Sequence, residues 1–275
     1  MPLRAKQPSE RSKRLKALMF SPAGVGKTVA GIQMPRPYIV DTEAGTQHYG
    51  AMIEKAGGAV YATNSMEETI EEAKSLLTER HNFQSFVLDS FTPMYDNEVD
   101  KGEREVGSEW GRHYGYANRT CKRLFNLLAM LDMNVIVTAH SKNEYNTDHK
   151  IVGNTFDGWR RLDYLFDLVF ELQRRGTKRI AIVRKTRIAE FPDQESFEWS
   201  FDALAQRYGG DLLTRESTPV QLATAEQVTL FAKLCQVLNL EPSAVADRVQ
   251  KAGAESVGEL DTVTIGLWIM ALQKD

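Results

Sequence analysis

The sequence of 275 residues has little of what several protein classes require. It contains only two cysteines, Cys121 and Cys235, and their wide separation excludes a zinc or redox motif, so we expect two buried thiols in a reducing compartment. No apolar run approaches the roughly 18 residues that a membrane-spanning helix needs. The N-terminus also lacks the apolar stretch of a signal peptide. These absences predict a cytoplasmic protein with no membrane partner.

An excess of positive charge is also absent, since the formal net charge is -3. The protein is therefore not a general polycation, and any contact with nucleic acid must use local basic patches. Residues 1–16 form one such patch, in which basic side chains outnumber the single acid, Glu10. We interpret residues 1–16 as a basic N-terminal arm, which is either a solvated tail or a segment that contacts nucleic acid or a neighbouring subunit.

Hydrophobic residues make up 42% of the chain, which is typical of a soluble globular protein. Short apolar segments predict buried strands at residues 15–20, 38–41, 59–62, 85–89 and 135–139. Helices are predicted after the glycine-rich turn that follows residue 20, over 65–80, where Ser65 and Glu68 form a capping box, and over about 110–131. This alternation predicts an α/β fold with a mostly parallel sheet and helices on both faces.

Strands at 168–172 and 179–183, with a turn around Gly176 between them, predict an antiparallel hairpin that extends the sheet. Residues 91–109 and 141–158 are polar and contain glycine, and we expect both to be long loops.

The last part of the chain contains only helical patterns, at 225–239, 242–252 and 261–273. We therefore divide the chain into the basic arm at 1–16, a core at 17–215 and a small helical domain at 216–275.

A phosphate-binding motif lies between the first predicted strand and the helix after it. The pattern is G-x-x-x-x-G-K-[ST]. The residues in these positions are Ser21, Pro22, Ala23, Gly24, Val25, Gly26, Lys27 and Thr28. Only the first position departs from the pattern, because serine stands where glycine is usual. The alternative, a chance glycine-rich turn, is disfavoured by the strand before the motif and the helix after it.

Each part of this motif has a physical role. The backbone amides of the loop and the helix N-terminus form a nest for phosphate oxygens. Lys27 would place a positive charge on the terminal phosphates, and the hydroxyl of Thr28 would complete the oxygen shell of Mg²⁺. The motif therefore predicts that the chain binds and hydrolyses a nucleoside triphosphate with Mg²⁺.

Phosphoryl transfer also needs an acidic residue near the metal ion. Asp89 ends the predicted strand at 85–89, and ligands bind at the carboxyl ends of the strands in such sheets. An aspartate at a strand end is often only a turn residue, but the phosphate-binding motif upstream favours a metal-binding role for Asp89.

Four motifs, spread over residues 15–190, resemble those of the RecA-like recombinase family and occur in the same order. They are an aspartate–x–glutamate at a strand end, an aspartate–serine pair, a polar residue at the end of the next core strand, and a late pair of basic residues. The residues concerned are Asp41 and Glu43, Asp89 and Ser90, His140, and Lys185 with Arg187. His140 departs from the glutamine that is commoner in the family. The variants are most similar to those of short phage RecA-like proteins of the single-strand-annealing recombinase group.

The resemblance implies ATP as the nucleotide, self-association into a ring or filament, and a role for each motif. Glu43 would orient or deprotonate the attacking water. His140 would bind the γ-phosphate and couple its presence to the segment that follows. Lys185 and Arg187 would stabilise charge on the ATP of a neighbouring subunit. The simpler alternatives are a surface acid, a strand-end histidine and an exposed, charged strand end.

In the resembled family, the segments after Asp89 and His140 line the path of DNA. The second segment and the residues after it carry cations and aromatic rings, which single-strand binding requires. The residues that we expect to bind single-stranded DNA are Lys142, Asn143, Tyr145, Lys150, Arg160 and Arg161. The alternative is that both segments are ordinary mobile surface loops.

The sequence thus favours an ATP-dependent recombinase or annealing protein that acts on single-stranded DNA, with a single-strand-binding protein or another recombination protein as a further partner. Its expected location is the cytoplasm, or the host cytoplasm if a phage encodes it. The main alternative is a loader or remodeller of a protein partner in DNA replication or repair. A nucleotide-binding regulator without turnover and a small-molecule kinase are further alternatives, although no lid or acceptor motif of a kinase is evident.

Overall fold

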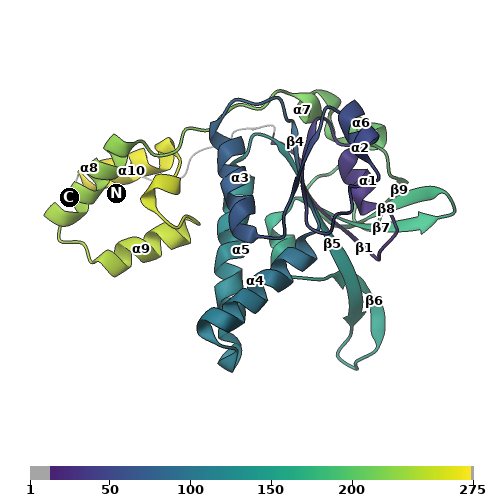
Figure 1. Cartoon of the computed structure of the whole chain (residues 1–275), viewed down its shortest axis with the longest axis horizontal. Helices are drawn as coiled ribbons and strands as arrows, with labels where there is room; N and C mark the ends of the chain where they lie inside the picture. The colour runs from purple at the N-terminus through teal and green to yellow at the C-terminus, as the bar shows by residue number, and fades with distance from the viewer. Residues whose placement is uncertain (1–12, 274–275) are drawn as a thin grey trace.

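The computed structural model describes residues 13–273 (Figure 1). Within them, a nine-stranded sheet has the order β3-β2-β4-β5-β1-β7-β8-β9, and β6 pairs with β5 outside this order. β1 to β5 and β7 are parallel, whereas β6, β8 and β9 are antiparallel to their partners. The strands are β1 (Lys16–Ser21), β2 (Pro37–Asp41), β3 (Ala59–Ala62), β4 (Ser85–Asp89), β5 (Asn134–Tyr145), β6 (Ile151–Phe156), β7 (Leu168–Arg175), β8 (Lys178–Thr186) and β9 (Ser196–Glu198).

Helices cover both faces of this sheet, so the predicted α/β architecture is confirmed (Figure 1). One face is covered by α1 (Lys27–Ile32), α2 (Gly50–Lys55), α6 (Phe201–Tyr208) and α7 (Gly210–Thr214). The other face is covered by α3 (Met66–Thr78), α4 (Phe91–Val106) and α5 (Arg112–Met130). The chain ends with α8 (Ala225–Val237), α9 (Pro242–Lys251) and α10 (Thr262–Leu272). Single 3₁₀ turns lie at Glu109–Gly111, Leu162–Leu165 and Val257–Glu259.

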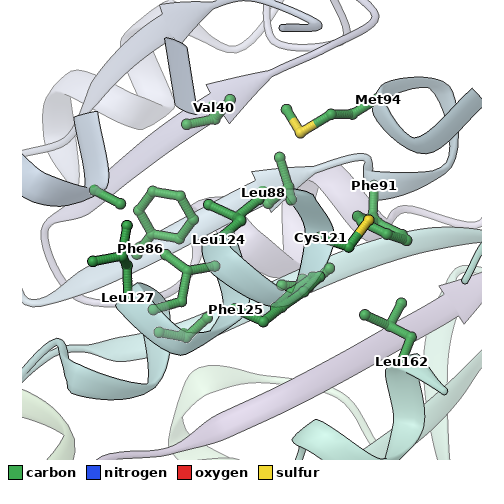
Figure 2. Close-up of a cluster of buried hydrophobic side chains, with 14 of the residues drawn as sticks. Val40, Phe86, Leu88, Phe91, Met94, Cys121, Leu124, Phe125, Leu127 and Leu162 are labelled. Carbon is green, nitrogen blue, oxygen red and sulfur yellow. The ribbon is translucent and has the colours of Figure 1, made fainter. Parts of the chain in front are cut away.

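The larger apolar core lies between the sheet and the layer of α3, α4 and α5 (Figure 2). Phe86 and Leu88 of β4 pack there with Leu124 of α5, and all three are fully buried. Strands that are covered on both faces have continuous apolar sequences, which made the central strands recognisable. Cys121 is buried in the same core, as expected, whereas Cys235 is half-buried.

The prediction of a long loop at residues 91–109 is wrong, because most of this segment forms α4. Phe91 and Met94 are fully buried at helical spacing. Pro93 lies in the first turn, where a helix has no use for the missing N–H. Gly102 lies where α4 passes close to α5. The proline and the glycine are therefore compatible with a helix that exposes most of its charged side chains, although Glu98 is buried.

The second predicted loop, residues 141–158, is also wrong. β5 continues beyond the sheet to Tyr145 and pairs with β6 in a hairpin that projects from the core (Figure 1). In its turn, Oδ1 of Asn146 accepts hydrogen bonds from the backbone N–H groups of Asp148 (3.0 Å) and Lys150 (2.9 Å). Neither face of this hairpin is buried, so it lacks the alternating apolar pattern that predicts a strand.

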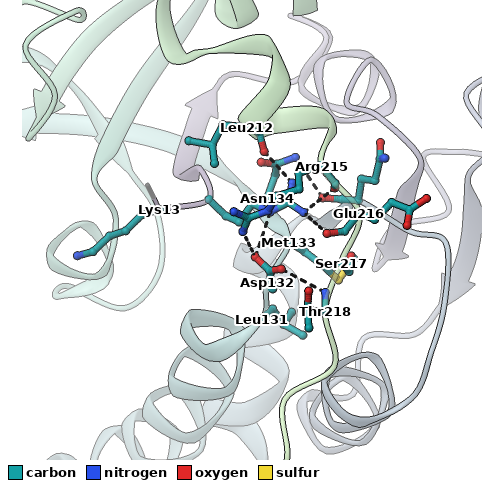
Figure 3. Close-up of polar contacts among 12 residues, drawn as sticks. Lys13, Leu131, Asp132, Met133, Asn134, Leu212, Arg215, Glu216, Ser217 and Thr218 are labelled. Carbon is teal, nitrogen blue, oxygen red and sulfur yellow. Dashed lines mark hydrogen bonds and ion pairs between the residues drawn. The ribbon is translucent and has the colours of Figure 1, made fainter. Parts of the chain in front are cut away.

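The end of the predicted basic arm belongs to the core, and the arm interpretation is wrong for Arg14 and Lys16. Arg14 is only 4% exposed, and its guanidinium lies 3.2 Å from Asp132. It also donates hydrogen bonds to the backbone carbonyls of Leu212, Arg215 and Glu216. Figure 3 shows this polar region, where Asp132 also receives bonds from Arg215 and Thr218. Residues 1–12 of the arm lie outside the described residues.

The three C-terminal helices occur where helices were predicted, and they pack around an apolar cluster of their own that includes Phe231, Val249 and Ile265. A capping box between Thr224 and Gln227 begins α8. Figure 1 shows these helices beside α3, on the far side from α1. Among residues 13–273, no helix is both long enough and apolar enough to cross a membrane.

Candidate functional site

The phosphate-binding motif connects β1 to α1 at the carboxyl end of the parallel strands. Gly24 and Gly26 have φ angles of 75° and 109°, which residues with a Cβ rarely adopt. Ser21 is not among the positive-φ residues of the described chain, because it is the last residue of β1 and pairs in register with His140. The departure from glycine at the first position of the motif therefore does not strain the loop.

Lys27 lies inside this loop. Its Nζ donates to the carbonyl oxygens of Ser21 (3.0 Å) and Pro22 (3.3 Å), and the residue is 9% exposed. Burial lowers the pKa of Lys27, while the negative charges of Asp89 and Glu43 act in the opposite direction. The motif thus holds one cation at its centre, where phosphate oxygens would bind.

Asp89 lies at the carboxyl end of β4, next to Thr28. Its Oδ2 accepts a hydrogen bond from the Thr28 hydroxyl (2.6 Å), and its Oδ1 accepts one from the hydroxyl of Thr138 on β5. Burial raises the pKa of Asp89, although both hydroxyls and Lys27 act against the rise. A carboxylate beside a hydroxyl oxygen is a donor pair that suits Mg²⁺ with the phosphates of a nucleotide. Within residues 13–273, no group of three or more His, Cys, Asp or Glu side chains offers another metal site.

Glu43 lies in a turn after β2 that a buried aspartate holds in place. Oδ1 of Asp41 accepts from the N–H groups of Glu43 (3.2 Å) and Gly45 (3.0 Å), and its Oδ2 accepts from the N–H of Thr46 (2.9 Å). Burial opposes the ionisation of Asp41, but hydrogen bonds from Thr46, Glu43 and Gly45 outweigh it and leave the pKa below the ordinary value. The side chain of Asp41 therefore fixes the backbone of the turn that carries Glu43.

Glu43 and His140 are in direct contact. Oε2 of Glu43 lies 2.9 Å from Nε2 of His140 and accepts a hydrogen bond of 2.9 Å from the Ser90 hydroxyl. Both side chains remain partly open to solvent, at 45% for Glu43 and 41% for His140. The two residues assigned to the water and to the γ-phosphate thus form one polar pair, and Ser90 joins them to the end of β4.

His140 also lies at the base of the hairpin formed by β5 and β6. Its backbone N–H donates to Oγ1 of Thr92 (2.9 Å), and the Thr92 hydroxyl donates to the carbonyl of Asp157 (2.7 Å). The N–H of Asp157 returns to the carbonyl of His140 (2.8 Å), and the carboxylate of Asp157 pairs with Lys142 (3.0 Å). An unbroken series of polar contacts therefore connects Glu43 to the hairpin.

Lys185 and Arg187 lie away from the phosphate loop of their own chain. Thr186 pairs with Leu168, and Leu168 pairs with Ala17 at the beginning of β1. The phosphate loop begins at the other end of β1, roughly 13 Å further along the strand. Lys185 donates to the carbonyl of Asp163, and Arg187 lies 3.3 Å from Asp167. These two cations do not join Glu43, Asp89 and His140.

The tip of the hairpin formed by β7 and β8 supplies residues that the sequence did not reveal. Arg174, Thr177 and Arg179 line the same cavity as Lys27 and Asp89. β7 lies next to β1 and continues past its end, so that the hairpin tip reaches the level of the phosphate loop. The pattern of the hairpin was visible in the sequence, but its place beside β1 was not.

Four of the expected DNA-binding residues lie on the hairpin formed by β5 and β6, and all of them are exposed: Lys142, Asn143, Tyr145 and Lys150. Arg160 and Arg161 are exposed as well but lie in the chain between β6 and β7. The structure thus places the first four on one projecting element and the two arginines outside it.

The site as a whole is a cavity of about 770 Å³. It is lined by residues 22–28 of the motif and by Glu43, Asp89 and His140, together with the three residues of the hairpin tip. Hydrogen-bond donors, two carboxylates and a histidine therefore surround one space at the carboxyl edge of the sheet.

A family model described as the AAA domain matches residues 13–190, which include every element around this cavity. The chain belongs to the AAA domain family. It is therefore a P-loop ATPase domain, and domains of this kind bind nucleotide, typically with Mg²⁺. A comparison with curated protein sequences finds no match.

The fold of this AAA domain is RecA-like, and the chain is similar to several solved structures. The RadB recombinase is 18% identical with a TM-score of 0.45, covering 68% of this chain and 86% of its own. A DnaB-like replicative helicase is 11% identical with a TM-score of 0.44, and the match covers 69% of this chain and 55% of the helicase chain. The ATPase EscN from the type III secretion system of enteropathogenic E. coli is 14% identical with a TM-score of 0.40, covering 95% and 66%. These similarities concern the fold alone.

Proposed function

We propose that this AAA domain protein is an ATP-dependent single-stranded-DNA-binding protein of the recombinase or annealing type, which hydrolyses ATP between copies of itself. The observation that carries the proposal is the series of contacts from Glu43 through His140 to the hairpin formed by β5 and β6. His140 belongs both to the nucleotide site and to the exposed hairpin. Binding at the hairpin can therefore change hydrolysis at the nucleotide site, and the reverse.

The residues of the cavity suit ATP hydrolysis. Bound Mg²⁺ would supply charge neutralisation and hold phosphate oxygens, with Thr28 and Asp89 as its protein partners. The carboxylate of Glu43 is placed to accept a proton from water, since the side chain is partly exposed and Ser90 and His140 hold its Oε2. The imidazole of His140 could hydrogen-bond either to Glu43 or to a phosphate oxygen of the nucleotide. A switch from one partner to the other would shift His140, which lies at the base of the hairpin.

The hairpin formed by β5 and β6 suits a single strand of nucleic acid. Tyr145 is 57% exposed and offers a ring for base stacking, while Lys142 and Lys150 offer cations for phosphates. Lys142 is paired with Asp157, one of the residues that connect the hairpin to His140. A phosphate that competes for Lys142 would therefore act on the connection to the nucleotide site.

Assembly is a further part of the proposal. Lys185 and Arg187 are too far from their own phosphate loop to contact its nucleotide, so a role in ATP hydrolysis requires another copy of the chain. Lys185 also lies over the ring of Tyr164, which is 69% exposed, with 5.3 Å from Nζ to the ring centroid. An exposed aromatic ring beside two cations is a surface suited to a second subunit.

One observation favours the alternative of an ATP-dependent loader or remodeller of a protein partner. Ile151 and Val152 of β6 are 61% and 59% exposed, so the hairpin exposes an apolar side chain on each of its faces, which suits contact with a protein. In that case, the contacts between the hairpin and His140 would couple ATP hydrolysis to the binding of a protein instead of DNA.

The test is steady-state ATP hydrolysis with and without single-stranded DNA. We expect DNA to raise the rate several-fold in the wild type and Lys27→Ala to abolish hydrolysis in both conditions. Tyr145→Ala and Lys150→Ala should weaken the affinity for DNA, by about 1–3 kcal/mol for the lost stacking of Tyr145.

Lys233→Ala, at an exposed position of α8, is the matched control and should bind DNA like the wild type. Hydrolysis that depends on Lys27 but is indifferent to DNA would remove the recombinase proposal and leave the protein partner as the leading alternative.

A further inference from the structure

We propose that Arg179 is a nucleotide-binding residue, supplied by the same chain as the phosphate loop, that holds the two phosphates nearest the nucleoside. The inference rests on the nucleotide-binding part of the proposed function and adds a residue to that site.

The first observation is the contact between Arg179 and the loop. A Cβ built on Gly26 would lie 2.1 Å from Nε of Arg179 and 3.0 Å from its Cζ. The guanidinium therefore lies close to the backbone of Gly26, just before the start of α1. Gly26 is the residue before Lys27, so Arg179 contacts the loop at the point where its amides and the N-terminus of α1 meet.

The second observation is that the guanidinium has no partner within residues 13–273. Its Nε is buried and makes no hydrogen bond, and no ion pair involves its side chain. Arg179 as a whole is half-buried, but its guanidinium is always charged, so a buried Nε–H without an acceptor is costly. Arg207 and Arg123, by comparison, each pair with carboxylates. A polyphosphate in the adjoining cavity would supply acceptors that the protein does not.

The backbone of Arg179 is held on both sides. It pairs with Arg174 across the hairpin of β7 and β8, and its carbonyl accepts a hydrogen bond of 2.7 Å from the N–H of Trp199. A side chain on a strand that is fixed at both edges loses little freedom on binding a ligand. This anchoring distinguishes Arg179 from Arg174, which is exposed near the turn.

The order of the strands indicates which phosphates Arg179 would contact. Glu43 follows β2, Asp89 ends β4 and His140 lies within β5, and these three strands are on one side of β1, whereas Arg179 belongs to β8 on the other side. Water is activated on the side of Glu43 and His140, so the terminal phosphate belongs there. Arg179 therefore faces the remaining diphosphate, which is common to ATP and ADP.

The test is calorimetric titration of the full chain with Mg·ATP and, separately, with Mg·ADP. We expect Arg179→Ala to raise the Kd of both nucleotides about ten-fold or more, by a similar factor, because one charge-assisted contact is lost from the shared diphosphate. Arg179→Lys should recover part of the affinity, since it keeps the charge without the fork of donors. Arg175→Ala, on the same hairpin but outside the cavity, should bind like the wild type.

The outcomes separate this inference from the proposed function. Wild-type affinity in folded Arg179→Ala, or in Arg179→Gln if the alanine variant does not fold, overturns the inference and leaves the proposed function intact. Loss of affinity for ATP alone would place Arg179 on the terminal phosphate and also overturn it. A loss for both nucleotides in a protein whose hydrolysis ignores DNA supports Arg179 while the DNA proposal fails. A wild type that binds neither nucleotide removes both.

Discussion

At the scale of single residues, the turn that carries Glu43 depends on a side chain that does no chemistry. Asp41 is 3% exposed and its carboxylate accepts three backbone N–H groups and the hydroxyl of Thr46. These bonds favour its ionised form despite burial. The two acids of the aspartate–x–glutamate motif therefore have different roles, since Asp41 fixes the turn and Glu43 faces the cavity.

Glu43→Gln tests the role of the carboxylate in this turn. Glutamine keeps the size and the acceptor for Ser90 but cannot take a proton, so we expect hydrolysis to fall at least about 100-fold. The Kd for Mg·ATP should change little, because Lys27, Thr28 and Asp89 are untouched. Both quantities are measured on the purified variant, by phosphate release and by titration.

Glu54→Gln is the control for this substitution, since Glu54 is an exposed acid on the neighbouring α2 and lies outside the cavity. A Glu43→Gln variant that hydrolyses ATP at the wild-type rate would show that Glu43 is a surface acid and that another group activates water.

The residues around the phosphates differ in how far the sequence predicts them. Lys27 and Thr28 follow from a local pattern, and the structure brings Asp89, Glu43 and His140 to them because parallel strands end at one edge. Arg179 carries no such signal. It lies far from Gly26 in the sequence, and only the position of β7 beside β1 brings the two together.

At the scale of elements, the crossing of α4 and α5 depends on Gly102. A Cβ at this position would lie 2.8 Å from the carbonyl oxygen of His113 and 3.1 Å from Cβ of Tyr116. Because one neighbour is backbone, relief requires the helices to separate. We expect Gly102→Ala to destabilise the protein by about 1–3 kcal/mol, as measured by urea unfolding.

Gly115→Ala provides the opposite case in α5. No atom outside the local backbone of α5 lies within 4 Å of the added Cβ, so only the helix propensity changes, and we expect stabilisation of about 0.5–1 kcal/mol. If both alanine variants were equally stable or more stable than the wild type, close packing of α4 on α5 would not be the reason for Gly102.

The two wrongly predicted loops show where reading elements from a sequence fails. Strands buried on both faces and helices with clear caps were found close to their observed ends. In α4 the apolar stripe was hidden because Pro93 and Gly102, which usually interrupt helices, fit the first turn and the helix crossing. The hairpin formed by β5 and β6 gains its order from backbone pairing, which leaves no apolar pattern in the sequence.

At the scale of the whole molecule, a few charged side chains join the C-terminal helices to the core. Arg123 of α5 contacts Glu259 through Nη2 (2.5 Å) and Nε (3.3 Å), and Lys74 of α3 contacts the same carboxylate (2.9 Å). The Glu259 side chain is only 9% exposed. The N–H of Val220 also donates to the carbonyl of Leu77 (2.7 Å), which ties the linker to α3.

Glu259→Gln should weaken this attachment while leaving both parts folded. Loss of the charge removes hydrogen bonds to ionised partners, and we expect a cost of about 2 kcal/mol. Hydrogen exchange at Val220, measured by mass spectrometry on peptides around residues 217–224, should become roughly 30-fold faster. Glu71→Gln is the control, because Glu71 contacts the same Lys74 but is 67% exposed, and it should change exchange little.

The attachment should also depend on pH through Glu259. Burial acts to raise the pKa of this carboxyl, but Arg123, the N–H of Glu255 and Lys74 outweigh it, so the folded-state pKa lies below the ordinary 4.5. A carboxyl with a lowered pKa stabilises the folded form fully above its unfolded-state pKa and loses that contribution as pH falls through the folded-state value. We therefore expect the difference in exchange between the wild type and Glu259→Gln to be constant near neutral pH and to shrink below about pH 4.5. A difference that persisted unchanged in acid would mean that the substitution acts through uncharged contacts of this side chain and not through the charge of Glu259.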